Sequence, residues 1–217
     1  MRVVITGANR GIGRAMFDAY CMAGDDVIGT CRGEAPDAGT WIALNVADPI
    51  SQAALATSLK DQPIDLLVCN AGVYLDKGHD LDSGYPAQMW ADTFAANVGG
   101  VFQTVQTLLP NLRAAKGKIA IISSIMASST TAPGGSYIYR ASKAAVLNLG
   151  RNLAVDLKSD GVAVGIYHPG WVRTDMGGSS ADISVDEAVA GLTARFADLD
   201  IAKTGCFEFW DGSTHPF

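Results

Sequence analysis

Residues 1–13 read MRVVITGANRGIG, and this stretch decides the fold class. The β-branched run at Val3, Val4 and Ile5 has the length of a short strand, and a glycine-rich turn follows it. Glycines let the backbone turn tightly and let a phosphate approach without meeting a Cβ atom. The helix expected next directs its free N–H groups and positive dipole end toward that anion. The stretch predicts a phosphate-binding turn, with a turn used only for packing as the alternative.

Composition limits the class of protein. The chain of 217 residues is 48% hydrophobic and 18% charged, which suits one globular domain spanning residues 1–217. The net charge of −6 argues against a nucleic-acid partner, and no apolar stretch approaches a membrane span. The first strand begins at about Arg2, which leaves no room for a signal peptide. The scattered cysteines favour reduced thiols in a cytoplasmic protein and no metal site.

Strand-like and helix-like segments alternate along the chain. Strands are expected over residues 3–6, 26–30, 40–44, 65–70, 118–123, 162–167 and 205–210. Helices are expected over residues 12–23, 49–59, 90–115, 136–159 and 185–197. The strands are mostly apolar throughout, which is typical of strands buried on both faces of a parallel sheet. The pattern predicts an α/β, doubly wound Rossmann-type fold with a seven-stranded parallel sheet and helices on both faces.

Tyr139 and Lys143 stand four residues apart in a predicted helix and therefore share a face. A phenol titrates at about pH 10, too high for a base at neutral pH. A cation about 5 Å away, at an effective dielectric of about 20, favours the phenolate by roughly 3 kcal/mol, or roughly two pKa units. The pair is thus a candidate acid/base, and a chance pair on an amphipathic helix is the alternative.

Polar residues also occur at positions that secondary structure alone does not explain. Ser123 and Ser124 end a predicted strand, at the sheet edge where doubly wound folds bind ligands. A hydroxyl there can stabilise charge on a substrate oxygen, or simply satisfy local backbone. Asn97 lies within a predicted helix beside Gly99 and Gly100, which indicates a local irregularity; a tolerated polar residue is the alternative.

Together these features resemble the short-chain dehydrogenase/reductase family over nearly the whole chain, from Thr6 to about Gly212. The motifs that carry the resemblance are Thr6-Gly7-x3-Gly11-Ile12-Gly13, Asn70-Ala71-Gly72, Asn97, Ser123-Ser124, Tyr139-x3-Lys143 and Pro169-Gly170-x-Val172-x-Thr174. The run Tyr139-Arg-Ala-Ser-Lys143 and the ending Trp210-Asp211-Gly212 look closest to small C-factor-like and carbonyl-reductase-like members.

The resemblance implies a catalytic role for four residues. Tyr139 would exchange a proton with a carbonyl or alcohol oxygen, and Lys143 would lower its pKa and bind the nicotinamide ribose. Asn97 would hold a water that links Lys143 to solvent. Ser124 is assigned as the active serine.

The serine assignment departs from the family's spacing. The family's usual slot, thirteen residues before the tyrosine, is Met126 here, whereas Ser124 precedes Tyr139 by fifteen residues. Two extra residues are inferred between Ala127 and Ser136. Ser128 and Ser129 are alternatives for the active hydroxyl.

The resemblance also implies a nicotinamide dinucleotide site. Its residues would be Gly7, Asn9, Arg10, Gly11, Ile12, Gly13, Arg32, Asn45, Val46, Asn70, Ala71, Gly72, Tyr139, Lys143, Pro169, Gly170, Val172 and Thr174. Cys31 occupies the strand end where NAD-specific sites carry a carboxylate. Two nearby arginines can bind a 2′-phosphate, so NADP(H) is expected in preference to NAD(H); solvated surface arginines are the alternative. Asn45 stands where the family commonly has an aspartate that contacts adenine.

The expected activity is NADP(H)-dependent hydride transfer to or from a small-molecule carbonyl or secondary-alcohol substrate. A loop or short helix over residues 74–89 is expected to border the site, and a short polar segment from Met176 to about Ser184 predicts an open one. Candidate pocket-lining residues are Tyr74, Trp90, Tyr137, Trp171 and Met176.

A nucleotide-sensing or C-factor-like signalling protein with little turnover is the alternative to an enzyme. The presence of both Tyr139 and Lys143 favours catalysis. The family resemblance also implies a homodimer or homotetramer. Apolar side chains on more than one face of the predicted helices 90–115 and 136–159 support this expectation.

Overall fold

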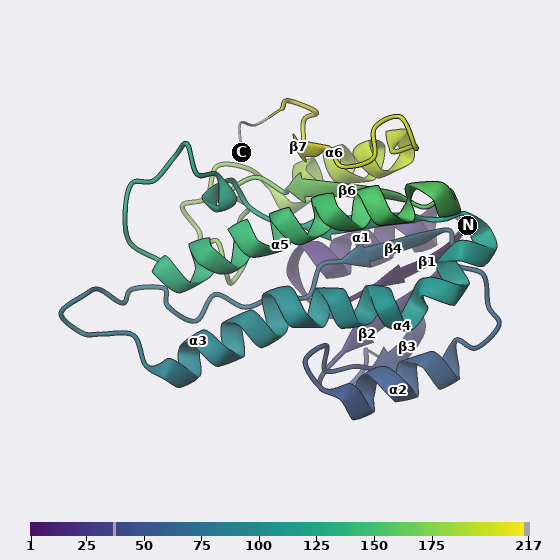
Figure 1. Cartoon of the computed structure of the whole chain (residues 1–217), viewed down its shortest axis with the longest axis horizontal. Coiled ribbons are helices and arrows are strands. Elements are labelled where there is room, and N and C mark those ends of the chain that lie inside the picture. The colour runs from purple at the N-terminus through teal and green to yellow at the C-terminus, as the bar shows by residue number, and fades with distance from the viewer. Residues whose placement is uncertain (37, 215–217) are drawn as a thin grey trace.

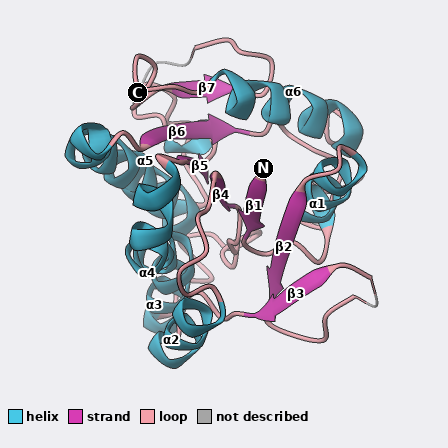
Figure 2. Cartoon of the chain, turned by 90° about the vertical axis from the view of Figure 1, so that its right-hand side faces the viewer, coloured by secondary structure: helices cyan, strands magenta, loops and turns pink. Residues whose placement is uncertain are grey.

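A seven-stranded parallel sheet forms the centre of the molecule in the computed structural model, which describes residues 1–36 and 38–214. The strands lie in the order β3-β2-β1-β4-β5-β6-β7 (Figure 2). Their bounds are β1 (Arg2–Ile5), β2 (Asp26–Cys31), β3 (Thr40–Ala43), β4 (Leu66–Cys69), β5 (Lys118–Ile122), β6 (Ala163–His168) and β7 (Phe207–Phe209). All seven predicted strands are present, and the predicted doubly wound fold is confirmed.

Helices cover both faces of the sheet (Figures 1 and 2). On one face α1 (Gly11–Met22) packs against α6 (Val185–Asp198). On the other face lie α2 (Pro49–Ser58), α4 (Gly100–Ala115) and α5 (Tyr137–Leu157). The short α3 (Ala87–Phe94) precedes α4. Because each face is covered, both sets of alternating strand side chains are buried, and the strands read as continuous apolar runs.

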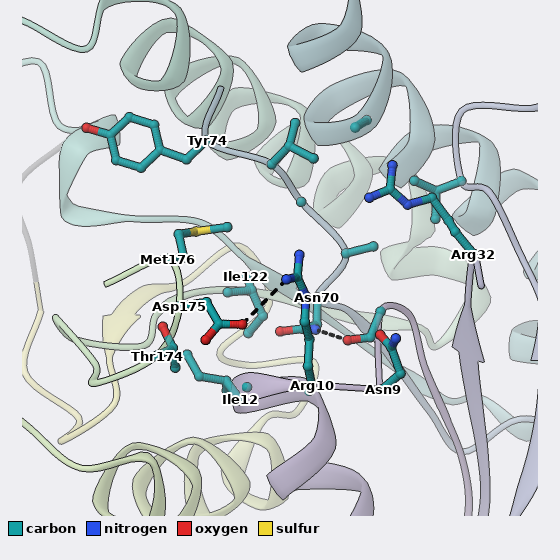
Figure 3. A pocket seen from close by; sticks show the side chains of 18 of the residues that line it. Asn9, Arg10, Ile12, Arg32, Asn70, Tyr74, Ile122, Thr174, Asp175 and Met176 are labelled. Carbon is teal, nitrogen blue, oxygen red and sulfur yellow. Dashed lines mark hydrogen bonds and ion pairs between the residues drawn. The ribbon is translucent and has the colours of Figure 1, made fainter. Parts of the chain in front are cut away.

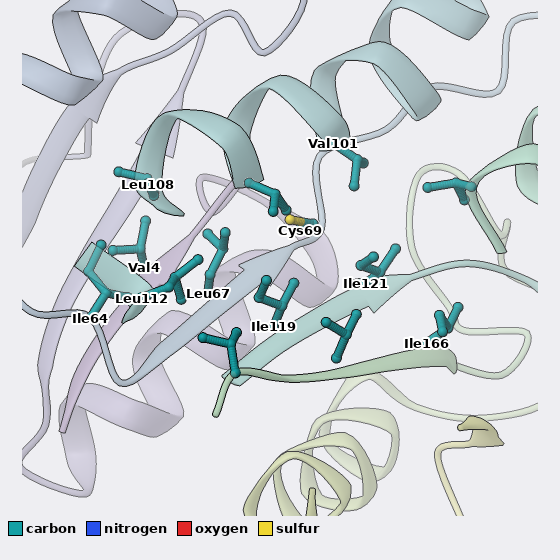
Figure 4. Close-up of a cluster of buried hydrophobic side chains, with 14 of the residues drawn as sticks. Val4, Ile64, Leu67, Cys69, Val101, Leu108, Leu112, Ile119, Ile121 and Ile166 are labelled. Carbon is teal, nitrogen blue, oxygen red and sulfur yellow. The ribbon is translucent and has the colours of Figure 1, made fainter. Parts of the chain in front are cut away.

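Each face of the sheet has its own hydrophobic core. Val4, Leu67 and Ile119 pack under α2, α4 and α5 (Figure 4), whereas their sequence neighbours Val3 and Val68 pack under α1 and α6. Complete burial of one such side chain stabilises the fold by about 1.5–3 kcal/mol. The register aligns these layers, since Val4 pairs with Ile28 on β2 and with Leu67 on β4.

The order of strands reverses at β1. The chain runs from β1 outward to β2 and β3, then returns to place β4 on the other side of β1. Connections from the carboxyl ends of β1 and β4 therefore diverge to opposite faces and leave a crevice between them, where doubly wound folds bind ligands.

The helix predicted over residues 90–115 is interrupted. A π-helical segment, η1 (Ala95–Gly99), separates α3 from α4 and carries Asn97. The expected irregularity beside Gly99 and Gly100 is therefore present. Short π segments occur often at functional sites because they turn side chains out of the regular helical register.

The helix starts differ in how they are capped. At α2 the Asp48 carboxylate accepts from the N–H groups of Ile50 and Ser51, and Pro49 occupies the first helical position. At α5 the residue in the N-cap position is Ser136, whose backbone is left-handed at φ 48° and whose hydroxyl pairs with the Tyr74 hydroxyl. The first N–H groups of α5 are instead satisfied from a distant segment, described below.

Candidate active site

A cavity of about 510 Å³ opens at the reversal of strand order. It runs from the glycine-rich turn past the ends of β2 and β4 to the side chains of α5, as part of its lining shows (Figure 3). Sixteen of the predicted site residues line it: Gly7, Asn9, Arg10, Gly11, Ile12, Gly13, Arg32, Asn45, Val46, Asn70, Ala71, Gly72, Tyr139, Lys143, Pro169 and Thr174. Residues far apart in sequence thus form one elongated site.

The glycine-rich turn is held in place by its neighbour strand. Gly7 adopts φ +64°, and a Cβ there would lie 3.0 Å from the Ala71 Cα atom. A Cβ at Gly13 would overlap the Gly7 carbonyl oxygen and the Asn70 amide. The Asn70 Nδ2 atom donates to the Gly7 and Thr6 carbonyl oxygens, each at 3.0 Å. The turn is therefore a cradle that glycine alone fits, with the form that a bound pyrophosphate requires.

At the other end of the cavity, Tyr139 and Lys143 lie on one face of α5, both buried. The Lys143 Nζ atom lies 5.6 Å from the centroid of the Tyr139 ring and donates to the Ile122 carbonyl at 2.9 Å. The Ser124 hydroxyl lies near enough to the Tyr139 phenol to lower its pKa. These contacts bring a proton donor, a hydroxyl and a cation to one place.

Burial changes the ionisation of this group. Desolvation, followed by the neighbouring Tyr74 phenol, raises the pKa of Tyr139 above its ordinary value, while the Ser124 hydroxyl lowers it. Desolvation lowers the pKa of Lys143 to about 8. The expectation that the pKa of Tyr139 is lowered by two units is therefore wrong for this structure, because desolvation is the largest influence on the phenol and raises its pKa.

Ser124, the serine assigned from the sequence, lowers the pKa of the Tyr139 phenol. It follows β5 and also accepts from the Met126 N–H at 3.1 Å. The alternative Ser128 exchanges a hydrogen bond with Thr130 at 2.8 Å. The neighbouring Ser123 donates to the Lys143 carbonyl at 3.1 Å, which ties the end of β5 to α5.

Asn97 lies behind the cavity wall and does not line it. Its side-chain amide forms two hydrogen bonds with the backbone of Val73, accepting from the N–H at 2.8 Å and donating to the carbonyl at 2.9 Å. The same amide donates to the Ser142 hydroxyl at 3.0 Å. Asn97 therefore couples the strand-end segment after Asn70-Ala71-Gly72 to α5.

Three other predicted site residues, Ser124, Gly170 and Val172, also lie outside the lining. A Cβ at Gly170 would press against Ile183 and Trp210, and Val172 is buried and paired by an isolated bridge to Ile183. Both support the loop that carries Pro169 and Thr174 to the cavity. Of the five candidate lining residues, Tyr74 and Met176 line the cavity, whereas Trp90, Tyr137 and Trp171 do not.

The two arginines occupy different walls. Arg10, in the glycine turn, forms an exposed ion pair with Asp175 at 3.5 Å, and Arg32 follows β2 on the far side (Figure 3). Asp175 is a cavity-lining residue that the sequence analysis did not select. A weak, solvent-exposed pair of this kind contributes at most about 1 kcal/mol, so an incoming phosphate can displace it.

Sequence analysis also missed contacts in the loop after β4. Tyr74 stacks on Tyr139, with ring centroids 4.2 Å apart. Lys77 crosses the cavity to donate to the Met176 carbonyl at 2.9 Å. Asp76 is fully buried and faces the start of α5. The loop lacks a periodic pattern from which these contacts could be predicted. The sequence indicated only that the loop borders the site.

Two wider features concern residues 1–36 and 38–214. No helix there is long and apolar enough to cross a membrane. In that same part of the chain, no group of three or more histidine, cysteine, aspartate or glutamate side chains could hold a metal ion.

Comparisons with known proteins identify the family. The family model for short chain dehydrogenases matches residues 1–183. The C-signal protein of Myxococcus xanthus is 34% identical over 169 residues, covering 76% of this chain and 99% of that protein. The 3-oxoacyl-[acyl-carrier-protein] reductase FabG of Escherichia coli is 30% identical over 204 residues, covering 88% of this chain and 80% of that enzyme.

Solved structures agree with this result. The NADPH-bound carbonyl reductase from chicken fatty liver superposes with a TM-score of 0.91 at 28% identity, covering 100% of this chain and 98% of that one. The sequence match, the fold and the positions of the motifs lead to one conclusion: the chain belongs to the short-chain dehydrogenase/reductase family.

Proposed function

We propose that this protein is an NADP(H)-dependent carbonyl reductase. The observation that carries the proposal is that one cavity joins the glycine cradle to the buried Tyr139, with Lys143 beside it and the Ser124 hydroxyl near enough to lower the pKa of its phenol. A cradle alone would fit a nucleotide-binding protein. A proton donor at the far end of the same cavity adds a reason for chemistry.

The bound nicotinamide cofactor would supply the hydride to the substrate carbon. Tyr139 would donate a proton to the carbonyl oxygen, and the Ser124 hydroxyl would orient that oxygen through a hydrogen bond. Lys143, still mostly protonated at neutral pH because its pKa is about 8, would stabilise the phenolate that remains. Asn97 would hold the wall segment at Val73 and, by family resemblance, a water on the path to Lys143.

The ionisation of Tyr139 favours the reductive direction. Burial raises the pKa of the phenol, so the neutral form is the resident one at physiological pH. A neutral phenol can donate a proton to a carbonyl, whereas the oxidation of an alcohol needs a group that accepts one. The raised pKa thus supports carbonyl reduction.

The proposed preference for NADP(H) rests on charge at the adenosine end. Arg32 lines the cavity after β2, and the buried Cys31 stands where a carboxylate would repel a 2′-phosphate. The similar chicken liver reductase is described as NADPH-bound, which supports the same choice here.

The proposed substrate is a bulky, apolar aldehyde or ketone. Tyr74, Leu75 and Met176 line the end of the cavity near Tyr139. Apolar walls of this kind favour an apolar substrate body, with the polar contact confined to the carbonyl group.

The test compares the wild-type protein with Tyr139→Phe. We expect wild type to oxidise NADPH when it is supplied with aromatic or aliphatic aldehydes and ketones, and to bind NADPH more tightly than NADH. Loss of the general acid is expected to lower kcat by about 100-fold to 10,000-fold. NADPH affinity, followed by cofactor fluorescence, is expected to stay within about twofold, because the phenyl ring keeps its stack on Tyr74.

Other outcomes separate the alternatives. Full turnover by Tyr139→Phe would remove Tyr139 as the acid. Tight NADPH binding without turnover on any carbonyl would favour a nucleotide-sensing protein. Weak binding of both nucleotides would overturn the cofactor assignment.

A further inference from the structure

Asp76 is a buried charged residue to which the mechanism above gives no role. It lies in the loop after β4, and its side chain is fully buried. Burial of a carboxylate is costly unless hydrogen bonds replace its hydration. Its partners therefore indicate why the fold retains it.

Those partners are the first N–H groups of α5. The Asp76 carboxylate accepts from the Ile138 N–H at 2.8 Å and from the Tyr139 N–H at 3.2 Å. It thus caps the helix from 62 residues away in sequence, where the local Ser136 hydroxyl is turned toward Tyr74. The positive end of the α5 dipole stabilises the same negative charge.

We infer that Asp76 is a positioning residue for Tyr139: its carboxylate fixes the first turn of α5 through two helix N–H groups and places a negative charge next to Tyr139. This inference rests on the proposed function, because it assigns the charge a consequence for the acid. It distinguishes Asp76 from an ordinary helix cap, which would affect stability alone.

Each group that faces Tyr139 has a stated effect. From the loop after β4, the Tyr74 phenol and the Asp76 carboxylate both raise the pKa of Tyr139. From the end of β5, the Ser124 hydroxyl lowers it. Lys143, on α5 itself, is the neighbouring cation. Removal of the Asp76 charge leaves Lys143 as the charged neighbour, so ionisation of the phenol becomes easier.

The same loop also contacts Tyr139 through a second residue, Tyr74. Two residues before Asp76, Tyr74 stacks on the Tyr139 ring and pairs its hydroxyl with Ser136 at the helix start. The loop therefore holds both the ring of Tyr139 and the backbone that carries it. Displacement of the reacting oxygen by even about 1 Å can cost about 100-fold in rate.

The experiment compares Asp76→Asn with Asp80→Asn in the full-length protein. Asp80 belongs to the same loop but is exposed and caps the Ser83 N–H at 2.7 Å, so its variant is a matched control. The readouts are the pH profile of kcat/KM for carbonyl reduction, NADPH affinity, and amide hydrogen exchange of the segment that begins α5.

For Asp76→Asn we expect the alkaline limb of the profile to move down by about half a pH unit or more, because the phenol loses a nearby negative charge that disfavours its ionisation. We expect kcat to fall about tenfold, NADPH affinity to stay within about twofold, and exchange at the start of α5 to speed up. Asp80→Asn is expected to match wild type in all three readouts.

Contrary results are equally definite. A profile that overlays wild type, or unchanged exchange at the start of α5, would overturn the inference. If wild type itself reduces no carbonyl, the proposed function fails, and the exchange measurement still decides whether Asp76 holds the helix. If Asp76→Asn does not fold, Asp76→Ser keeps an oxygen acceptor without the charge and is judged by the same criteria.

Discussion

Lys143 and Tyr139 show how depth of burial decides the ionisation of a residue. Both side chains lie on α5 at the bottom of the cavity, and desolvation is the largest influence on each. Spacing on a helix predicts that the two are neighbours, and they are. Their depth depends on the loop after β4 and the end of β5, which local spacing does not encode. The position of the pair was therefore predictable, and the direction of the phenol's pKa shift was not.

The lowered pKa of Lys143 predicts a dependence of stability on pH. Its pKa is about 8 in the folded protein against 10.5 ordinarily, so the unfolded chain binds the extra proton between these values. Stability contributed by Lys143 therefore rises with pH, by about 1.5 kcal/mol between pH 8 and pH 9.5. In Lys143→Met this rise is expected to vanish. Denaturant unfolding of both proteins measures it, since titrating cysteines and tyrosines affect both alike. A flat difference between the two proteins would contradict the prediction.

Arg32 is expected to set cofactor choice. It stands at the adenosine end of the cavity, where a charge-assisted bond to a 2′-phosphate is worth about 1.5–3 kcal/mol. Arg32→Ala is therefore expected to weaken NADPH binding by about 10-fold to 100-fold and to leave NADH binding within about twofold. Titration with both nucleotides measures this. Equal losses for the two would show that Arg32 does not recognise the phosphate.

At the scale of elements, the glycine turn and the start of α1 act as one unit. Gly13→Ala places a methyl group against the Gly7 carbonyl and the Asn70 side-chain amide. These two groups are hydrogen-bonded to each other and cannot easily move aside. We expect a loss of about 1–3 kcal/mol in unfolding free energy and at least tenfold weaker NADPH binding.

Gly33→Ala is the control, since a Cβ there meets no atom within 4 Å. Similar thermal shifts in both variants would sink this account of the turn.

Elements differed in how much of them could be predicted. The strands and α1, α2, α5 and α6 follow local periodicity, and the structure contains each of them. The region from Trp90 to Ala115 was predicted as one helix. The π-helical segment within it, Ala95–Gly99, has the residue composition of an ordinary helix and differs only in its backbone hydrogen bonds. Asp76 escaped notice because its partners lie on α5, and a contact between such distant segments leaves no periodic trace in the loop.

At the scale of the whole molecule, apolar side chains remain exposed on the helices of one face. Phe102 on α4 is 42% exposed and Val155 on α5 is 75% exposed. We expect these helices to pack against a second copy of the chain. Light scattering should show a dimer or tetramer for wild type and a smaller species for the double variant Phe102→Glu/Val155→Glu. Met22→Glu, on α1 and 89% exposed, is the control. A monomeric wild type would refute this expectation.

Lys77 and Met176 both line the cavity, and the hydrogen bond from Lys77 Nζ to the Met176 carbonyl forms a bridge between the loop after β4 and the segment after β6. A ligand that is wider than the space beneath this bridge has to separate Lys77 from Met176 in order to bind. The bridge is a single solvent-exposed hydrogen bond, worth about 1 kcal/mol. The Lys77–Met176 hydrogen bond can therefore break and re-form without a movement of the sheet or of the helices that cover it.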